Sequence, residues 1–292
     1  MTLSEMRRLL ESRQLLLTKS LGQNFLHDGN VLRRITTAAA LQAGDRVLEI
    51  GPGLGPLTEH LLDAGVPVLA VEKDQRLYEI LQERFAGHPR LTLLHADALD
   101  WLQNEPRDWT GWKLVANLPY SVGSPLLVEL ALAERPPERM VVTLQWEVIQ
   151  RLTALPDTAD YGVLTALVGL QFESRGAFKI SRDCFHPAPD VESACATLVR
   201  RPTPLLPSDR ITAYARVVKL AFSQRRKMLR KLLRSEWPEP VLDAALAATG
   251  IAPTARAETI SIPRLAALTD HLVGTPLPTD TGRLSAHDPG IH

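Results

Sequence analysis

The stretch Val47–Gly55, with the sequence VLEIGPGLG, decides the fold because an apolar run opens directly into closely spaced glycines. Glycine adopts positive φ without strain and lets the backbone approach a ligand closely. Pro56 suits the first position of a following helix, whose apolar residues up to Leu62 share one face and end near Gly65. The stretch therefore predicts a strand, a tight turn and a helix whose N–H groups point toward a nucleotide-type ligand.

Three further predicted strands each lead into a polar side chain: Val66–Val71 before Glu72, Leu91–Ala96 before Asp97, and Leu114–Ala116 before Asn117. Glu72 follows Gly51 by about 20 residues, the spacing at which an acid typically accepts hydrogen bonds from a ribose. Open α/β sheets bind ligands at the carboxyl ends of their strands. The pattern predicts an α/β fold of Rossmann-like type, with helices on both faces of the sheet.

The glycine spacing favours one kind of cofactor over another. The G-x-G-x-G that begins at Gly51 has Pro56 where a dinucleotide site places its third glycine. S-adenosylmethionine has no pyrophosphate, but its adenine and ribose suit Asp97 and Glu72. We therefore predict S-adenosylmethionine, with a purely structural turn as the simplest alternative. A nicotinamide oxidoreductase is disfavoured further, because no catalytic His or Tyr–Lys arrangement stands at a strand end.

The tetrapeptide Asn117-Leu118-Pro119-Tyr120 indicates what is done with the cofactor. An adenine amine is a poor nucleophile because its lone pair is delocalised into the ring, so a catalyst must hold both of its hydrogens. The Asn117 side-chain oxygen and the Leu118 carbonyl are suitable acceptors, and Pro119 stiffens the turn. Tyr120 is suited to stack on an extruded base. The alternative is an ordinary loop with a capping asparagine and a packed tyrosine.

The length and composition of the chain are those of a globular protein with a large core. The 292 residues are 45% hydrophobic and 23% charged, enough for one large domain and a small one. Uncharged stretches such as Tyr161–Phe172 are shorter than the roughly 20 residues of a membrane span. We expect a cytoplasmic protein without a secretory leader. Cys184 and Cys195 are the two cysteines and predict neither a disulfide framework nor a metal site.

The net charge is zero, but basic residues are concentrated near the C-terminus. Nine of them and no acid lie between Arg210 and Ser235. On one helix, Arg226, Arg230 and Arg234 would share a stripe at i, i+4 and i+8. This surface predicts salt-dependent RNA binding, with a merely solvated basic face as the alternative. The RNA-binding candidates are Arg225, Arg226, Lys227, Arg230, Lys231 and Arg234.

The chain divides after a last predicted strand at Ala194–Val199, where three prolines mark a linker: Pro202, Pro204 and Pro207. Helical periodicity follows at Arg210–Leu233, Val241–Ala248 and Ile262–Val273. We therefore expect a catalytic domain with an N-terminal arm at 1–201 and a small helical RNA-binding domain at 202–273. A tail rich in Pro, Thr, Gly and Asp, residues 274–292, is expected to be disordered.

Five ordered segments resemble the bacterial small-subunit ribosomal RNA adenine N6-dimethyltransferases: Lys19–Leu26, Glu49–Gly55, Asn117–Tyr120, Phe185–Ser193 and Ala221–Lys227. The resemblance spans about Lys19 to Leu272. It implies a class I methyltransferase fold, S-adenosylmethionine as cofactor, and dimethylation of two adjacent adenosines near the 3′ end of 16S rRNA during small-subunit biogenesis. It also implies a pre-assembled small subunit as partner, and we expect a monomer.

The resemblance also assigns roles to residues. Phe185 would face Tyr120 as a second aromatic wall, against the alternative of a core phenylalanine. The chain departs from the family pattern at Gln145-Trp146-Glu147, where the family commonly has a basic residue, and at Ser121–Ser124, which puts RNA contacts in question. The cofactor would be held by Gln23, Asn24, Leu26, Gly51, Gly53, Glu72, Lys73, Asp97, Ala98 and Asn117.

Two other functions remain compatible with this pattern. A large-subunit rRNA adenine methyltransferase is the nearest, although Leu118 and the C-terminal basic segment favour the small-subunit type. The other is a ribosome-assembly factor that binds RNA with little catalysis.

Overall fold

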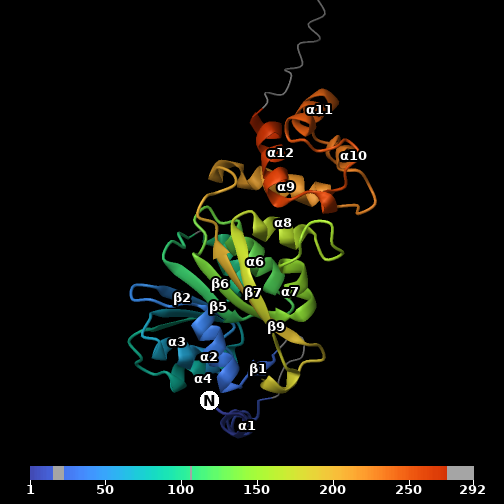
Figure 1. Cartoon of the computed structure of the whole chain (residues 1–292). Helices are drawn as coiled ribbons and strands as arrows, with labels where there is room; N and C mark the ends of the chain where they lie inside the picture. Colours follow the sequence, from blue (N-terminus) through green and yellow to red (C-terminus); the bar gives the residue numbers. More distant parts are fainter. Residues whose placement is uncertain (16–22, 106, 275–292) are drawn as a thin grey trace, which may run out of the picture.

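A computed structural model describes residues 1–15, 23–105 and 107–274. Its centre is a seven-stranded sheet of order β4-β3-β2-β5-β6-β9-β7 (Figure 1). The strands are β2 (Arg46–Ile50), β3 (Val68–Glu72), β4 (Leu91–His95), β5 (Trp112–Asn117), β6 (Arg139–Gln145), β7 (Phe172–Ile180) and β9 (Ser193–Arg200). Strands β2 to β6 are parallel, and β9 runs antiparallel to β6 and β7. The predicted α/β sheet is confirmed.

Alternate side chains of the strands enter two apolar cores. On β2, Val47 packs toward α2 and α3 whereas Leu48 packs toward α5 to α8, and both are fully buried. A strand that is covered on both faces has a nearly continuous run of apolar residues in its sequence. Helices therefore cover both faces, as expected. Their bounds are α2 (Gly29–Ala38), α3 (Pro56–Asp63), α4 (Gln75–Arg84), α5 (Ala98–Asn104), α6 (Gly123–Ala131), α7 (Trp146–Leu152) and α8 (Val163–Gly169).

The order of the strands creates a crevice. Strand β2 lies between β3, which follows it in the chain, and β5, which comes after β4. The crossovers therefore run in opposite directions from the middle of the sheet, and ligands bind at such a switch point. Glu72 and Asn117, the last residues of β3 and β5, lie at this edge beside the glycine loop.

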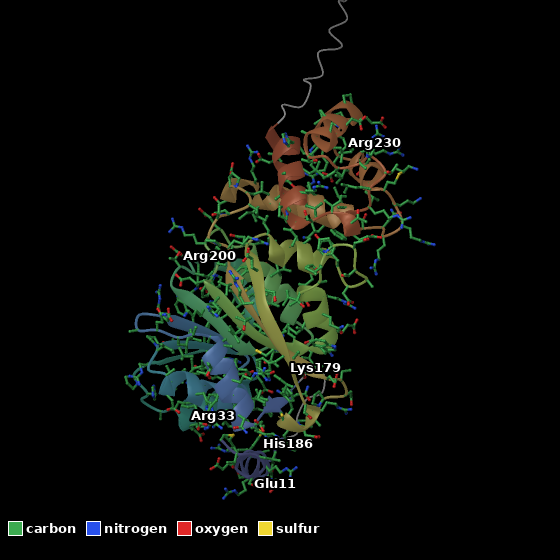
Figure 2. All side chains as sticks on the ribbon, viewed as in Figure 1. Glu11, Arg33, Lys179, His186, Arg200 and Arg230 are labelled. Atoms are coloured by element: carbon green, nitrogen blue, oxygen red, sulfur yellow. The ribbon has the colours of Figure 1, made fainter. Side chains whose placement is uncertain are left out.

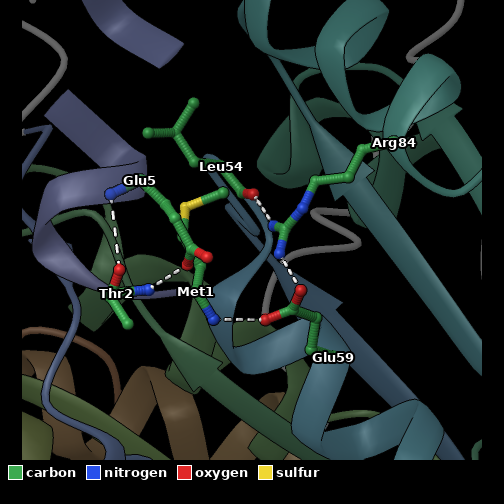
Figure 3. A network of polar contacts seen from close by, with 6 residues as sticks. All are labelled: Met1, Thr2, Glu5, Leu54, Glu59 and Arg84. Carbon is green, nitrogen blue, oxygen red and sulfur yellow. Dashed lines mark hydrogen bonds and ion pairs between the residues drawn. The ribbon is translucent and has the colours of Figure 1, made fainter. Parts of the chain in front are cut away.

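The N-terminal part lies against this same edge. Helix α1 (Leu3–Ser12) buries Met6 and Leu10 in a small core shared with Phe25 and Leu54. The Met1 amino group bonds to Glu59 of α3 at 2.6 Å, and the same carboxylate contacts Arg84 of α4, which also donates to the backbone of the glycine loop (Figure 3). The short strand β1 (Phe25–Leu26) pairs with β8 (Phe185–His186).

A helical part follows β9. It comprises α9 (Ile211–Ala221), α10 (Leu229–Leu233), α11 (Glu239–Ala248) and α12 (Ile262–Gly274), with 3₁₀ turns at Ser208–Arg210 and Ala257–Thr259. Ala166 and Leu167 of α8 belong to its core, so the boundary at residue 202 stays a prediction. The tail prediction falls outside the described residues except for Gly274. No helix within the described ranges is long and apolar enough to cross a bilayer.

One helix prediction is wrong. The periodic segment Arg210–Leu233 is not one helix, because α9 ends at Ala221 and α10 begins at Leu229. Between them, Met228 is extended and the Leu229 N–H donates to Ala255 O at 2.8 Å. The turn lets apolar residues of both short helices enter one core, which a straight 24-residue helix would not allow. Arg226 therefore lies on a loop, and the predicted arginine stripe does not form.

We predict that Tyr161→Phe destabilises the protein. The Tyr161 hydroxyl is buried where α8 meets the helical part and donates to Ile260 O at 2.8 Å. Its loss leaves a buried carbonyl unpaired, and the free energy of unfolding should fall by about 1–2 kcal/mol. Tyr78→Phe is the control, since that hydroxyl is solvent-facing. Equal losses in urea unfolding of the two variants would contradict the prediction.

Candidate active site

A pocket of about 870 Å³, open at its mouth, lies at the carboxyl edge of the sheet. Its lining of apolar side chains with a few polar groups is that of a small-molecule site. It brings together twelve residues predicted for the cofactor and the target amine: Gln23, Asn24, Gly51, Gly53, Glu72, Lys73, Asp97, Ala98, Asn117, Leu118, Pro119 and Tyr120. The family segment that begins at Lys19 lies outside the described residues as far as Gly22.

The glycine loop has no room for side chains. Gly51 and Gly53 have φ values of 68° and 62°. A Cβ on Gly53 would lie 2.6 Å from the Phe25 ring, and one on Gly51 would lie 3.3 Å from Pro119. Glycine is thus required both for the turn and for the close approach of these two rings. The loop is held between the N-terminal arm and the tetrapeptide.

Glu72 is positioned by the glycine loop itself. Its side chain is 6% exposed, and its two oxygens accept from the N–H groups of Gly53 (3.1 Å) and Asp74 (2.9 Å). Burial raises the pKa of Glu72, and the backbone hydrogen bonds oppose that shift. Each carboxylate oxygen has a further lone pair. The arrangement fits a ribose, whose two hydroxyls are donors.

Asp97 has a structural role besides the predicted one. It caps α5 by accepting from the N–H groups of Leu99 (2.9 Å) and Asp100 (3.3 Å), and its other oxygen bonds to Lys73 Nζ at 2.6 Å. The hydrogen bond from Lys73 lowers the pKa of Asp97, so the carboxylate is charged. A bound adenine would share this carboxylate with an exposed lysine.

Asn117 presents an unpaired acceptor. Its Nδ2 donates to Asn24 O at 3.0 Å, which fixes the orientation of the amide. Its Oδ1 is buried and finds no donor among the described residues. Because a buried acceptor without a donor costs about 1–3 kcal/mol, this atom marks the place of a missing ligand donor. Leu118 is held beside it by donating its N–H to Thr143 O at 3.1 Å.

Tyr120 connects two of the family-like segments. Its hydroxyl lies 2.5 Å from Oγ of Ser193, the last residue of the segment Phe185–Ser193. Ser193 is completely buried, whereas the Tyr120 ring lines the pocket. Burial raises the pKa of Tyr120, so the hydroxyl stays neutral. The ring is thus held at one edge by a single short hydrogen bond.

Two predicted site residues do not line the pocket. Leu26 and Phe185 are paired across β1 and β8, and they are 2% and 3% exposed in the core beneath α2 and α3. Their roles toward cofactor and base stay predictions. The second aromatic ring that does line the pocket is Phe25, which the sequence analysis missed. Nothing in its local sequence signals that the ring covers Gly53.

Other lining residues were missed as well. The polar ones are Asp74 and Ser121, and the apolar ones are Ile50, Val71, Leu77, Ala96, Leu99, Val122 and Leu126. Asp74 could have been found from its place two residues after Glu72, as the cap of α4. It accepts from the Gln23 amide at 3.0 Å and so holds the N-terminal arm to the pocket.

The predicted RNA-binding residues differ in their surroundings. Arg230 bonds to Asp243 (2.6 Å) and Glu239 (3.0 Å), so it joins α10 to α11. Arg225 donates to Ala159 O at 2.6 Å. Four others are exposed with no carboxylate partner in the described part of the chain: Arg226, Lys227, Lys231 and Arg234. Figure 2 shows Arg230 on the helical part, far from His186 at the other end of the molecule.

Fold and pocket together define a class I methyltransferase that uses S-adenosylmethionine. A family model described as "Ribosomal RNA adenine dimethylase" matches residues 15–272, and the chain belongs to this family. The chain is 42% identical over 275 residues to "Ribosomal RNA small subunit methyltransferase A" of Magnetococcus marinus, covering 93% of this chain and 96% of the relative. The protein of the same name from Gloeobacter violaceus is 40% identical over 269 residues, covering 91% and 97%.

Solved structures agree with the fold. The 23S rRNA methyltransferase ErmE has a TM-score of 0.65 at 30% identity, covering 86% of this chain and all of that chain. A dimethyladenosine transferase from Plasmodium falciparum has a TM-score of 0.69 at 22% identity, covering 84% and 95%. The first supports the same enzyme family, and the second shows a shared fold.

We predict that stability falls with rising pH because of Glu49. This carboxyl on β2 is 1% exposed, and burial raises its pKa to about 8 although Thr58 donates to it at 2.7 Å. The folded protein then holds a proton that the unfolded chain releases above its ordinary value of 4.5. The free energy of unfolding should therefore decrease between about pH 5 and pH 8.

Urea unfolding across this pH range provides the measurement. Glu49→Gln, which keeps an acceptor for Thr58, should remove much of the slope, while the exposed Glu147→Gln should leave it unchanged. A slope that is identical in the wild type and Glu49→Gln would refute the assignment.

We predict that Ser193 acts by positioning Tyr120. Ser193→Ala and Tyr120→Phe should each lower kcat on the RNA substrate, and the double variant should be no worse than the more affected single variant, because both remove the same hydrogen bond. A double-mutant cycle on kcat/KM measures this coupling. Donor affinity serves as a control for intact folding, and fully additive losses would exclude the role.

Proposed function

We propose that this protein dimethylates N6 of two adjacent adenosines near the 3′ end of small-subunit (16S) rRNA. S-adenosylmethionine is the donor, and the reaction belongs to the biogenesis of the small ribosomal subunit. The partner is the pre-assembled small subunit, which a monomer of this protein meets in the cytoplasm. The single observation that carries the catalytic part is the buried, unpaired Oδ1 of Asn117 beside the pocket. The small-subunit target is supported by the names of relatives about 40% identical over most of the chain.

The cofactor, when bound, supplies a methyl group already activated by a sulfonium. Glu72 would hold its ribose and Asp97 its adenine, at the floor of the pocket. The glycine loop allows close backbone approach, and apolar side chains form much of the lining. With the cofactor held in this way, its reactive end would face the tetrapeptide, which lines the same pocket.

The remaining residues act on the adenosine. In the first transfer Asn117 Oδ1 and the Leu118 carbonyl accept the two hydrogens of N6, which aims the lone pair away from the ring plane; in the second transfer one of these acceptors holds the single hydrogen that remains. Tyr120 stacks on the extruded base and keeps it from returning to the RNA stack. The proton released from N6 passes to water. Orientation supplies most of the rate enhancement, and no side chain becomes a covalent nucleophile.

The helical part is the proposed RNA-binding domain. Arg225, Arg226, Lys227, Lys231 and Arg234 contact phosphates, whereas Arg230 holds α10 and α11 together. Such contacts make the affinity for RNA fall with salt. The large-subunit alternative is favoured by a different observation, the 30% identity to ErmE. Identifying the methylated adenines separates the two targets.

The decisive experiment uses purified protein, labelled S-adenosylmethionine at saturation, and under-methylated small or large subunits. The wild type should methylate adenosines of the small subunit. Asn117→Ala should lower the rate by at least about 100-fold, the usual cost of removing one oriented hydrogen-bonding group from a transition state. Binding to the particle should persist, because Asn117 lies apart from the basic surface.

Asn30→Ala is the matched control, since this asparagine is exposed on α2. It should behave as the wild type. Loss of particle binding together with methylation in Asn117→Ala would mean that the assigned roles are wrong. An unchanged rate would show that catalysis does not depend on this amide, whereas a wild type that binds the particle without methylating it would be an assembly factor.

A further inference from the structure

Trp146 differs in its surroundings from most tryptophans of this protein. Trp101, Trp109 and Trp112 pack edge to face in one cluster, with ring centroids 6.0 and 5.5 Å apart along the series. Trp237 packs against the helical core. Trp146 is half-buried at the first position of α7, directly after β6 ends. It packs at the margin of the core beneath α5 to α8 and forms no aromatic pair within the described residues.

Trp146 is tied to the tyrosine that holds the target base. The backbone N–H of Trp146 donates to Glu192 O at 2.9 Å. The residue before it, Gln145, is paired with Ser193 across β6 and β9. Ser193 in turn lies 2.5 Å from the Tyr120 hydroxyl. The backbone of Trp146 and the side chain of Tyr120 are therefore bonded to consecutive residues, whose Cα atoms lie about 3.8 Å apart. Neither Trp146 nor its neighbours on α7 line the cofactor pocket.

A cation already lies over the Trp146 ring. Lys179 Nζ, near the end of β7, is 4.8 Å from the ring centroid and 2.8 Å from a Glu192 carboxylate oxygen. The lysine and glutamate side chains are 53% and 58% exposed, so both meet solvent. Figure 2 shows Lys179 toward the same end of the sheet as His186. An aromatic face beside an accessible ammonium is the combination that binds single-stranded nucleotides, by stacking and by phosphate contact.

We propose that Trp146 and Lys179 form a second nucleotide site next to the target-base pocket. Lys179 moves from Glu192 and from the face of the Trp146 ring to the neighbouring phosphate, and the base adjacent to the target adenosine stacks on the ring in its place. This inference rests on the proposed function, because it assumes an RNA strand whose target base lies on Tyr120. The flanking nucleotide is thereby held while its neighbour is extruded.

The test is steady-state methylation of under-methylated small subunits at saturating S-adenosylmethionine. Trp146→Ala should raise KM for the particle by roughly 5- to 30-fold, the equivalent of one lost base stack. The value of kcat should stay near that of the wild type, because the contact is the same in the ground and transition states. Lys179→Met should raise KM less and weaken its dependence on salt.

Replacing Trp146 by an aromatic or by an aliphatic residue distinguishes base stacking from mere burial of apolar area. Trp146→Phe should restore most of the affinity, whereas Trp146→Leu, which keeps apolar area without an aromatic face, should resemble alanine. Glu147→Ala, on the next residue of α7, should be neutral. Donor affinity should be the same in every variant, since these side chains lie outside the cofactor pocket.

Three results would overturn the proposal: an unchanged KM in Trp146→Ala, equal rescue by leucine and phenylalanine, or a loss of donor affinity in Trp146→Ala that marks the ring as structural. Failure of the wild type to methylate small subunits would instead refute the proposed function. The two failures are therefore distinguishable in the same assay.

Discussion

The hydrogen bond from Asn117 Nδ2 to the Asn24 carbonyl is the contact on which the site depends. An amide has one donor end and one acceptor end, so pairing the nitrogen decides where the oxygen points. Here the oxygen is left buried without a donor from any residue that the structure describes. The same bond attaches the N-terminal arm to β5 and places Phe25 over the glycine loop. Fixing a polar group before the substrate arrives is what lets a preorganised site stabilise a transition state.

Much of the fold could be predicted from local sequence. The run Val47–Ile50, its glycine turn and the helix that starts at Pro56 follow from apolar patterning and backbone geometry, and the structure has them at these positions. Glu72 and Asn117 are expected at the same edge of the sheet, because each ends a parallel strand and the carboxyl ends of parallel strands lie together. Such features depend on residues close in the chain, where the physical signal is strong.

Other features depend on contacts between distant segments and could not be predicted in this way. The break between α9 and α10 is decided by the shared helical core and by Ala255, not by the periodicity of Arg210–Leu233. The same limit applies to charge. Arg230 belongs to a basic run in sequence, but Asp243 and Glu239 reach it from another helix. The cover that Phe25 provides over Gly53 is also invisible until the chain is folded.

The pairing of β1 with β8 has a consequence for the order of assembly. Phe25 and Leu26 are among the first residues of the sheet-forming part, yet their partners Phe185 and His186 are made some 160 residues later. A nascent chain that has completed β2 to β6 already contains the glycine loop, Glu72 and Asn117. It lacks β8, the strand that pairs with β1 and so fixes Phe25 at the pocket. Contacts of such long sequence separation form late, because closing the loop is entropically costly. The enzyme thus gains its complete donor site only when synthesis has passed β8, after most of the methyltransferase sheet already exists.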